Sequence, residues 1–185
     1  MRVIAGTARG IRLKTPDGMQ TRPTADRVKE ALFSIVHFDL PRATVLDLFG
    51  GTGQLGIEAL SRGAKHAVFV DVRQDACALI HENLKKTGFA DRAQVICSDY
   101  LSYLKKHKQK FDIILLDPPY AEVFLENSLK MITEIDILQS GGIIIAERPD
   151  GKDFPWEFAG FDRSKDYKYG NTLLTIFRKT EDVQK

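Results

Sequence analysis

The chain has 185 residues, of which 43% are hydrophobic and 28% charged, and its formal net charge is +2. This length and composition predict one globular domain with a full core. No run of about 18 apolar residues is present, so we expect no membrane span, and we expect no secretion signal. Cys77 and Cys97 lie in apolar patterns, which predicts reduced core thiols in a cytoplasmic protein, and no Cys/His spacing indicates a metal site.

The charge is unevenly distributed along the chain. Residues 1–42 contain eight Lys/Arg and four Asp/Glu, a net +4, whereas residues 43–185 contain nineteen and twenty-one, a net −2. Pro41 marks the change, and we divide the chain there into an N-terminal arm, residues 1–42, packed on a catalytic domain, residues 43–185. On charge alone, a solvated face explains the basic arm as well as an anionic partner does.

Two kinds of element are predicted in the arm. Residues 2–5 and 11–15 are short strand candidates around a turn, which predicts a β-hairpin. A helix follows, with Thr24 as its N-cap and apolar residues recurring at i, i+3, i+4 and i+7, so one face should lie on the domain. This helix and the turn before it leave three basic side chains for solvent or a partner: Arg22, Arg27 and Lys29.

Strands and helices alternate from residue 43 onward. Strands are predicted at 45–49, 67–70, 94–97, 113–116 and 142–146, and helices at 54–62, 74–87, 101–106 and 122–138. The continuous Ile and Leu runs are typical of parallel strands covered on both faces. Residues 164–169 and 172–178, joined by Gly170-Asn171, predict an antiparallel hairpin. The fold class is therefore α/β and Rossmann-like, with a seven-stranded, mostly parallel sheet that ends in this hairpin.

The most informative stretch is VLDLFGGTGQLG, residues 45–56, which predicts a strand, a glycine loop and a helix start. Gly51, Gly53 and Gly56 fit G-x-G-x-x-G, and Asp71 follows at the distance typical of a dinucleotide site. A pyrophosphate would be repelled by Asp47, whereas S-adenosylmethionine (SAM) has no phosphate and carries a sulfonium and an ammonium. We therefore rank SAM above NAD, and a tight turn without a ligand stays open.

Acidic residues also follow the next three predicted strands, and ligands in such folds bind beyond the carboxyl ends of the strands. Asp71 is placed for ribose hydroxyls and Asp99 for an adenine amine, although an acid at each position could instead be a helix N-cap. We expect the cofactor site to consist of Asp47, Phe49, Gly50, Gly51, Thr52, Gly53, Asp71, Val72, Asp99 and Tyr100.

The motif Asp117-Pro118-Pro119-Tyr120 follows a buried strand and is our candidate catalytic element. The two prolines lack N–H donors and leave carbonyl oxygens free to accept, and Asp117 adds another acceptor. Tyr120 offers a ring on which a planar base can stack. The motif therefore indicates a site for the exocyclic amine of an unstacked nucleobase. A rigid turn is the alternative.

The DLFGGTG loop, Asp71 and DPPY together resemble class I amino-methyltransferases. The segments RVIAGTARGIRLKTP, TRPTADRVKEALFSIV, LGIEALSRGA and YKYGNT resemble the RsmD family, bacterial methyltransferases of a guanine N2 amine in small-subunit (16S) ribosomal RNA. The resemblance covers residues 1–178, and the loop GGTG differs slightly from the AGSG expected in the family. It implies SAM as cofactor and small-subunit RNA, or the assembling subunit, as partner. The expected RNA contacts are Arg2, Arg9, Arg12, Lys14, Arg22 and Arg27.

The implied reaction is in-line methyl transfer to the amine, in which the enzyme supplies alignment without a covalent nucleophile or a metal. Guanine presents N1–H and its N2 amine side by side, and the Asp117 carboxylate can accept from both. The alternatives that remain are an adenine-N6 DNA methyltransferase, a protein or small-molecule N-methyltransferase, an NAD oxidoreductase and a non-catalytic nucleotide-binding module. We expect a monomer, and we expect cofactor binding to be independent of the arm.

Overall fold

The computed structural model describes residues 1–16, 23–119, 122–151, 157–164 and 166–180. The strands are β1 (Thr44–Asp47), β2 (His66–Asp71), β3 (Ala93–Cys97), β4 (Phe111–Leu116), β5 (Leu138–Pro149), β6 (Phe161–Arg163), β7 (Tyr167–Tyr169) and β8 (Thr172–Lys179). The helices are α1 (Pro23–Ile35), α2 (Gln54–Ser61), α3 (Gln74–Thr87), α4 (Tyr100–Lys106) and α5 (Glu122–Ile135), with a 3₁₀ turn η1 (Ala90–Arg92).

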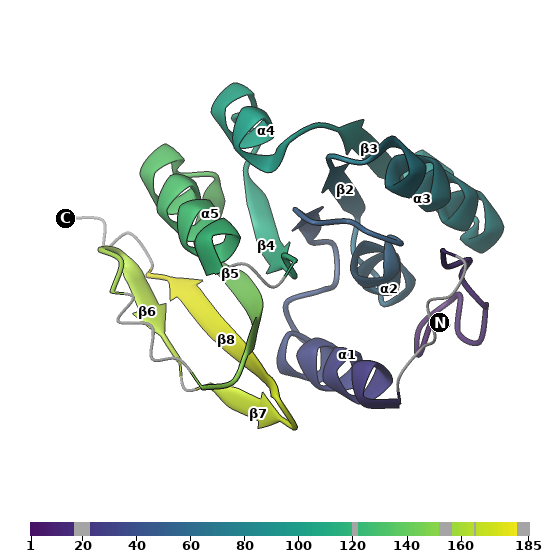
Figure 1. Cartoon of the computed structure of the whole chain (residues 1–185), viewed down its shortest axis with the longest axis horizontal. Helices are drawn as coiled ribbons and strands as arrows, with labels where there is room; N and C mark the ends of the chain where they lie inside the picture. The colour runs from purple at the N-terminus through teal and green to yellow at the C-terminus, as the bar shows by residue number, and fades with distance from the viewer. Residues whose placement is uncertain (17–22, 120–121, 152–156, 165, 181–185) are drawn as a thin grey trace.

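One sheet forms the centre of the molecule, with the order β3-β2-β1-β4-β5-β8-β6 and β7 also paired with β8 (Figure 1). β1 to β5 are parallel, and β8 is antiparallel to β5. The order reverses at β1, since the chain moves from β1 through β2 to β3 on one side and to β4 and β5 on the other. This is the topology predicted for a Rossmann-like sheet.

Helices cover both faces of the sheet, with α1, α2 and α3 on one face and α4 and α5 on the other (Figure 1). Strand side chains alternate between two hydrophobic clusters: Val45 and Ile113 belong to the first, Leu46 and Ile114 to the second. All four are 0% exposed. The continuous apolar runs of the sequence therefore correspond to strands buried on both faces, as predicted.

The C-terminal edge differs from the single predicted strand at residues 164–169. β6 pairs with residues 177–179 of β8 and β7 pairs with residues 172–174, so two short strands share one edge of β8. The turn at Gly170 has a positive φ of 61°, as the predicted hairpin requires. The sheet thus has seven positions across its width, as expected, but the last position is filled by two strands.

Four local predictions need correction. α1 begins at Pro23, so Thr24 lies inside its first turn and is not the N-cap; proline is favoured at the first helical position. α5 ends at Ile135, earlier than the predicted residue 138, because Asp136 adopts a φ of +54°. As a third correction, β5 begins at Leu138 and not at residue 142. The fourth correction concerns Cys97, expected in the core, which is exposed because it ends β3 at the sheet edge, whereas Cys77 is buried.

The arm is held on the domain by a shared core. Its hairpin is reduced to a single antiparallel bridge between Arg2 and Arg12. Val3, Ala8 and Leu13 are buried in the same hydrophobic cluster as the helices α1, α2 and α3. The arm therefore covers apolar surface that the parallel sheet and its helices would otherwise expose.

Glu58, fully buried in α2, anchors the start of the arm. Its two carboxylate oxygens accept hydrogen bonds from the backbone N–H groups of Ile4 (2.8 Å) and Ala5 (2.9 Å). Lys29, expected to face solvent, is 2% exposed; its Nζ donates to the carbonyl of Arg2 at 2.7 Å and lies 3.7 Å from Glu58. The prediction for Lys29 was wrong because helical periodicity does not show that the arm folds over this face of α1.

Candidate active site

The carboxyl ends of β1, β2, β3 and β4 surround a cavity of about 590 Å³ at the point where the strand order reverses. Ligands of open α/β sheets bind at this position. Many of the predicted cofactor and catalytic residues line the cavity: Asp47, Phe49, Gly50, Gly51, Thr52, Asp71, Val72, Asp99, Tyr100, Asp117 and Pro119. Gly53 and Pro118 are not in its lining, and Tyr120 lies outside the described residues.

The glycine loop shapes this cavity through backbone conformation and close packing. Gly51 and Gly53 have φ values of 54° and 78°, which favour glycine, and Gly53 precedes α2 as its N-cap. A Cβ on Gly56 would lie 2.2 Å from the ring of Phe69, so Gly56 allows α2 to pack directly on β2. Gly53 therefore acts from outside the lining, by turning the chain into the helix.

Asp47, at the end of β1, is 1% exposed. Its Oδ2 accepts a hydrogen bond from the Gly56 N–H at 3.0 Å. Its Oδ1 has no partner, and among the described residues it is the only buried side-chain nitrogen or oxygen atom without a hydrogen bond. Burial raises the pKa of Asp47 to about 7, and the charges of Asp117 and Asp71 act in the same direction. An unpaired buried carboxylate oxygen beside a cavity indicates a cationic or hydrogen-bond-donating ligand.

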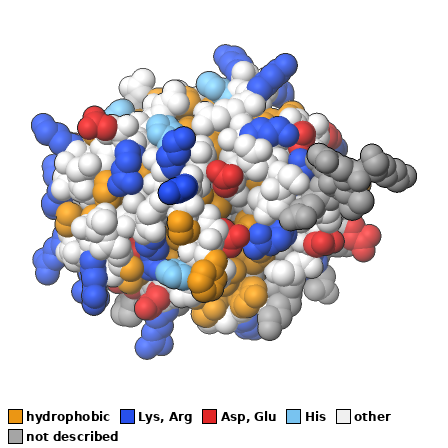
Figure 2. Space-filling model, turned by 180° about the vertical axis from the view of Figure 1, so that it is seen from behind, with side chains coloured by type: hydrophobic (Ala, Val, Ile, Leu, Met, Phe, Trp, Pro, Cys, Tyr) orange, Lys and Arg blue, Asp and Glu red, His pale blue; other side chains and the backbone are white. Residues whose placement is uncertain are grey.

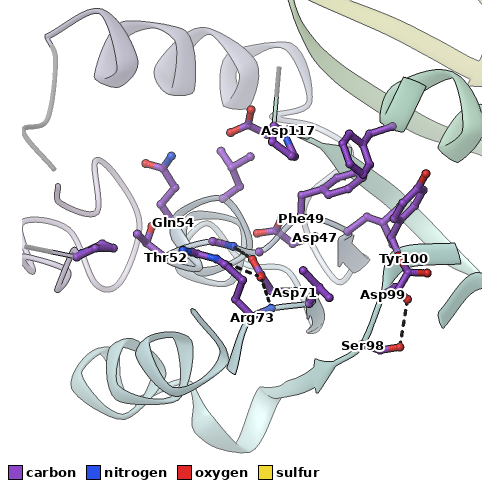
Figure 3. A pocket seen from close by; sticks show the side chains of 18 of the residues that line it. Asp47, Phe49, Thr52, Gln54, Asp71, Arg73, Ser98, Asp99, Tyr100 and Asp117 are labelled. Carbon is purple, nitrogen blue, oxygen red and sulfur yellow. Dashed lines mark hydrogen bonds and ion pairs between the residues drawn. The ribbon is translucent and has the colours of Figure 1, made fainter. Parts of the chain in front are cut away.

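Asp71, at the end of β2, joins two loops. Its Oδ2 accepts from the Gly51 N–H at 2.8 Å and its Oδ1 from the Arg73 N–H at 2.9 Å. Each carboxylate oxygen can accept a second hydrogen bond, so Asp71 can hold the glycine loop and still bind ligand hydroxyls. Figure 3 shows Asp47, Asp71 and Asp117 around the same hollow.

An aromatic wall closes another side of the cavity. The ring of Tyr100 lies 5.2 Å from that of Phe49 and 5.7 Å from that of Phe124, between centroids. Phe124 was not predicted, because its spacing on α5 resembles that of any core-facing residue. Asp99 caps α4, with its Oδ1 accepting from the Ser102 N–H at 3.0 Å, and this leaves its other oxygen for a ligand.

Asp117 lines the cavity from the end of β4, and burial raises its pKa to about 6. The carboxyl therefore stays mostly ionised at neutral pH but binds a proton more readily than an exposed aspartate. Asp47 and Asp117 bring two carboxylates of raised pKa to one hollow, an arrangement typical of functional sites.

The arm also reaches the cavity, which corrects the expectation that cofactor binding is independent of it. Met1 and Pro16 belong to the lining, and Thr52 donates through Oγ1 to the Met1 sulfur at 3.3 Å. Asn83, fully buried in α3, joins the two parts: its Nδ2 donates to the carbonyls of Thr52 (2.9 Å) and Lys14 (3.1 Å), and its Oδ1 accepts from the Lys14 N–H (2.7 Å). Sequence periodicity gave no signal for Asn83, since it is one polar residue within an amphipathic helix.

The expected RNA-contact residues in the described part of the chain are exposed: Arg2, Arg9, Arg12, Lys14 and Arg27. Lys14 forms an ion pair with Glu82 at 2.5 Å. Arg22 lies outside the described residues. In the same part of the chain, no cluster of three His, Cys, Asp or Glu side chains could hold a metal ion, and no helix has the length and apolarity of a membrane span.

Comparison with known proteins identifies the family. The model of a family described as "Conserved hypothetical protein 95" matches residues 1–178. The putative rRNA methyltransferase YlbH of Bacillus subtilis is 40% identical over 184 residues, 97% of this chain and 99% of its own. Ribosomal RNA small subunit methyltransferase D of Escherichia coli K12 is 30% identical over 179 residues, 97% of this chain and 90% of its own.

Solved structures agree with this assignment. The putative methyltransferase yhhF of Escherichia coli has a TM-score of 0.89 and 27% identity, covering 98% of this chain and 99% of its own. The putative methylase HI0767 of Haemophilus influenzae has a TM-score of 0.83 and 29% identity, covering 97% and 98%. The resemblance found in the sequence is thus confirmed: the chain belongs to the Conserved hypothetical protein 95 family, the RsmD family of SAM-dependent methyltransferases.

Proposed function

We propose that this protein transfers a methyl group from SAM to the exocyclic N2 amine of a guanine in small-subunit ribosomal RNA. The observation that carries the proposal is the pair of Asp47 and Asp117 on one cavity, one with an unpaired buried oxygen and the other at the start of the Asp-Pro-Pro-Tyr motif. The names of the relatives, which refer to methylation of small-subunit ribosomal RNA, support the substrate class.

The cavity fits SAM better than it fits a dinucleotide. The unpaired oxygen of Asp47 attracts the positive charges of SAM and would repel a pyrophosphate. The free acceptor positions of Asp71 suit ribose hydroxyls, and the wall of Phe49 and Tyr100 offers an apolar surface for a base. When SAM is bound, it supplies an electrophilic methyl group.

Asp117 is proposed to hold the substrate amine. Its carboxylate accepts hydrogen bonds from guanine N1–H and N2–H and so directs the amine lone pair toward the cavity. Because its pKa is raised to about 6, it is also able to take up the proton that the amine loses. Pro119 lies beside it in the lining and gives the motif a fixed backbone.

The arm is proposed to bind the RNA backbone. Arg9 and Arg12 are exposed, and neither forms an ion pair within the described part of the chain. Figure 2 shows Lys and Arg side chains spread over much of one face of the molecule, so the positive charge is not confined to one patch. Arginine and lysine side chains arranged in this way bind phosphates without reading sequence.

Tritiated methyl transfer tests the proposal directly. The full chain, tritiated SAM and undermethylated small-subunit RNA, free or assembled into subunits, should yield labelled N2-methylguanosine on nucleoside analysis. Asp117→Asn should lower kcat on guanine by about 10- to 100-fold with little effect on SAM affinity, since it puts an amide donor against N1–H or loses one bond. Labelled N6-methyladenosine, or label in protein alone, would refute the proposal.

A further inference from the structure

A second carboxyl lies next to Asp117 and is absent from the mechanism described so far. The register of β4 and β5 ends with the pair Leu116 and Ala146, and Asp117 and Glu147 are the next residue of each chain segment. The charge of Asp117 acts on Glu147, so the two side chains lie near each other. Side chains at paired positions of adjacent strands share one face of the sheet, with strands about 4.8 Å apart. Glu147 is therefore a direct neighbour of the proposed amine-binding residue.

Glu147 is half-buried and has no hydrogen-bond donor or ion-pair partner within the described part of the chain. Asp117, which follows β4, is the charged group that acts on Glu147. On the other side, Glu147 is paired with Leu174 of β8, which is in turn paired with Tyr167 of β7. The adjacent Arg148 is directed elsewhere, with its Nε donating to Thr175 at 2.9 Å and its Nη2 to Asp166 at 2.5 Å. In the part of the chain that the structure describes, no cation therefore neutralises Glu147.

This environment disfavours the charged form of Glu147. Burial, and then the charge of Asp117, raise the pKa of Glu147 to about 8, whereas that of Asp117 is about 6. Two adjacent carboxyls in a low-dielectric setting do not both ionise readily, so at neutral pH one is a carboxylate and the other a carboxylic acid. An unpaired carboxyl of this kind weakens the fold, which points to a role in binding.

We propose that Glu147 is a specificity residue that recognises O6 of the target guanine. Its carboxylic acid donates a hydrogen bond to O6 while the Asp117 carboxylate accepts from N1–H and the N2 amine, and this inference rests on the proposed guanine-N2 function. Guanine carries its O6 acceptor beside these two donors, whereas adenine carries an amine donor at the position of O6. The amine donor of an adenine would therefore face the donor of the Glu147 carboxylic acid, and the two could not form a hydrogen bond.

The placement of the two carboxyls agrees with this orientation of the base. Asp117 lines the cofactor cavity and Glu147 is not part of that lining. With the N2 amine at Asp117, the base has its reacting edge at the cavity and its O6 toward β5, away from the cofactor. The strand order β1-β4-β5 thus sets the direction in which the base edge is read.

A substrate with sulfur in place of O6 isolates this contact. 6-Thioguanine retains N1–H and the N2 amine but offers only a weak acceptor at position 6. When 6-thioguanine replaces the guanine that the wild type methylates, kcat/KM of the wild type should fall by about 10-fold, which is the effect of one lost hydrogen bond. Glu147→Ala should lose activity on guanine and show no further loss on 6-thioguanine. Glu147→Gln should retain sensitivity to the sulfur, because its amide N–H₂ also donates.

A pH series provides an independent readout. The preference of the wild type for guanine over 6-thioguanine should decline above about pH 8, where Glu147 ionises and loses its donor, and Glu147→Gln should keep it. Asp162→Asn, an exposed change on β6, is the matched control and should behave as the wild type.

The possible outcomes separate the two proposals. An equal sulfur penalty in the wild type and in Glu147→Ala would overturn the O6 contact, even if guanine N2 is methylated. A wild type that methylates no guanine N2 would refute the proposed function itself. If Glu147→Ala does not fold, as judged by thermal melting and SAM calorimetry, the pH dependence of Glu147→Gln decides: a preference that declines as in the wild type overturns the inference.

Discussion

Asp47→Asn should make the ligand-free protein more stable at alkaline pH while weakening its affinity for SAM. Asparagine is nearly isosteric with aspartate, and its Oδ1 can still accept from the Gly56 N–H, which is the hydrogen bond that Asp47 makes. What the substitution removes is a buried negative charge whose second oxygen has no partner.

The magnitude follows from linkage between protonation and folding. The pKa of Asp47 is raised from 3.8 to about 7, so the folded protein binds this proton more tightly than the unfolded chain does. Stability therefore falls as the pH rises between about 4 and 7, and above pH 7 the loss is at most roughly 4 kcal/mol. If half of this is recovered in Asp47→Asn at pH 8, Tm should rise by about 4–8 °C for a chain of this size.

Two assays test the reasoning. Thermal melting of the ligand-free proteins should show the higher Tm of Asp47→Asn at pH 8 and a much smaller difference near pH 4.5. Calorimetry at pH 7 in buffers of different ionisation enthalpy should show that SAM binding to the wild type releases about half a proton, since the cation favours the charged carboxylate. SAM affinity of the variant should fall roughly 10- to 100-fold.

Asp91→Asn, an exposed change on η1, serves as the control and should alter neither Tm nor affinity. A lower Tm for Asp47→Asn at pH 8 would contradict the electrostatic account, because it would mean that the carboxylate stabilises the ligand-free fold. Unchanged SAM affinity would show that the unpaired oxygen does not face the cofactor.

Three further predictions concern the arm and the glycine loop. Replacing Arg9 and Arg12 by Gln should weaken RNA binding and flatten its log–log salt dependence by ~0.7 per lost phosphate contact; an unchanged slope would exclude them from the interface. Gly56→Ala should lower the free energy of unfolding by about 1–3 kcal/mol in urea titrations, because its Cβ would lie 2.2 Å from Phe69, and a neutral result would mean that α2 can shift. Glu58→Ala should cost about 3–5 kcal/mol and expose the arm to limited proteolysis; an arm that stays protected would show that Glu58 is not its anchor.

Matched controls are available for the charge changes. Lys105 and Lys106, exposed in the last turn of α4 on the opposite face of the sheet from the arm, can be replaced by Gln without an expected change in RNA binding. Glu126→Ala, exposed on α5, should leave both stability and proteolysis of the arm unchanged.

The features that the sequence predicted well are those determined within one short stretch. The helix at 74–87 has the predicted bounds and ends at Gly88, which adopts a left-handed φ of 76°. The strand-end acids lie on one cavity because parallel strands bring their carboxyl ends to the same edge. In such cases a pattern of residues, the geometry of the element and the position of the site all follow from local rules.

The features that could not be predicted depend on contacts between distant segments. Lys29 and Glu58 are buried because the arm crosses them, and Asn83 bonds residues far from it in sequence. The neighbourhood of Asp117 and Glu147 depends on the β4–β5 register, which no local pattern fixes. Polar residues whose partners come from another part of the chain look, in sequence, like ordinary surface positions.

Asn83 has a consequence for the affinities of the cofactor site and the arm. A single buried amide holds both the carbonyl of Thr52, in the cofactor loop, and the backbone of Lys14, in the proposed RNA-binding arm. Any change of affinity that the cofactor causes at the arm must be matched by an equal change that RNA causes at the cofactor, because coupling free energies are reciprocal. The same reciprocity applies to the demethylated cofactor after the reaction, so any coupling between its release and the release of RNA acts equally in both directions.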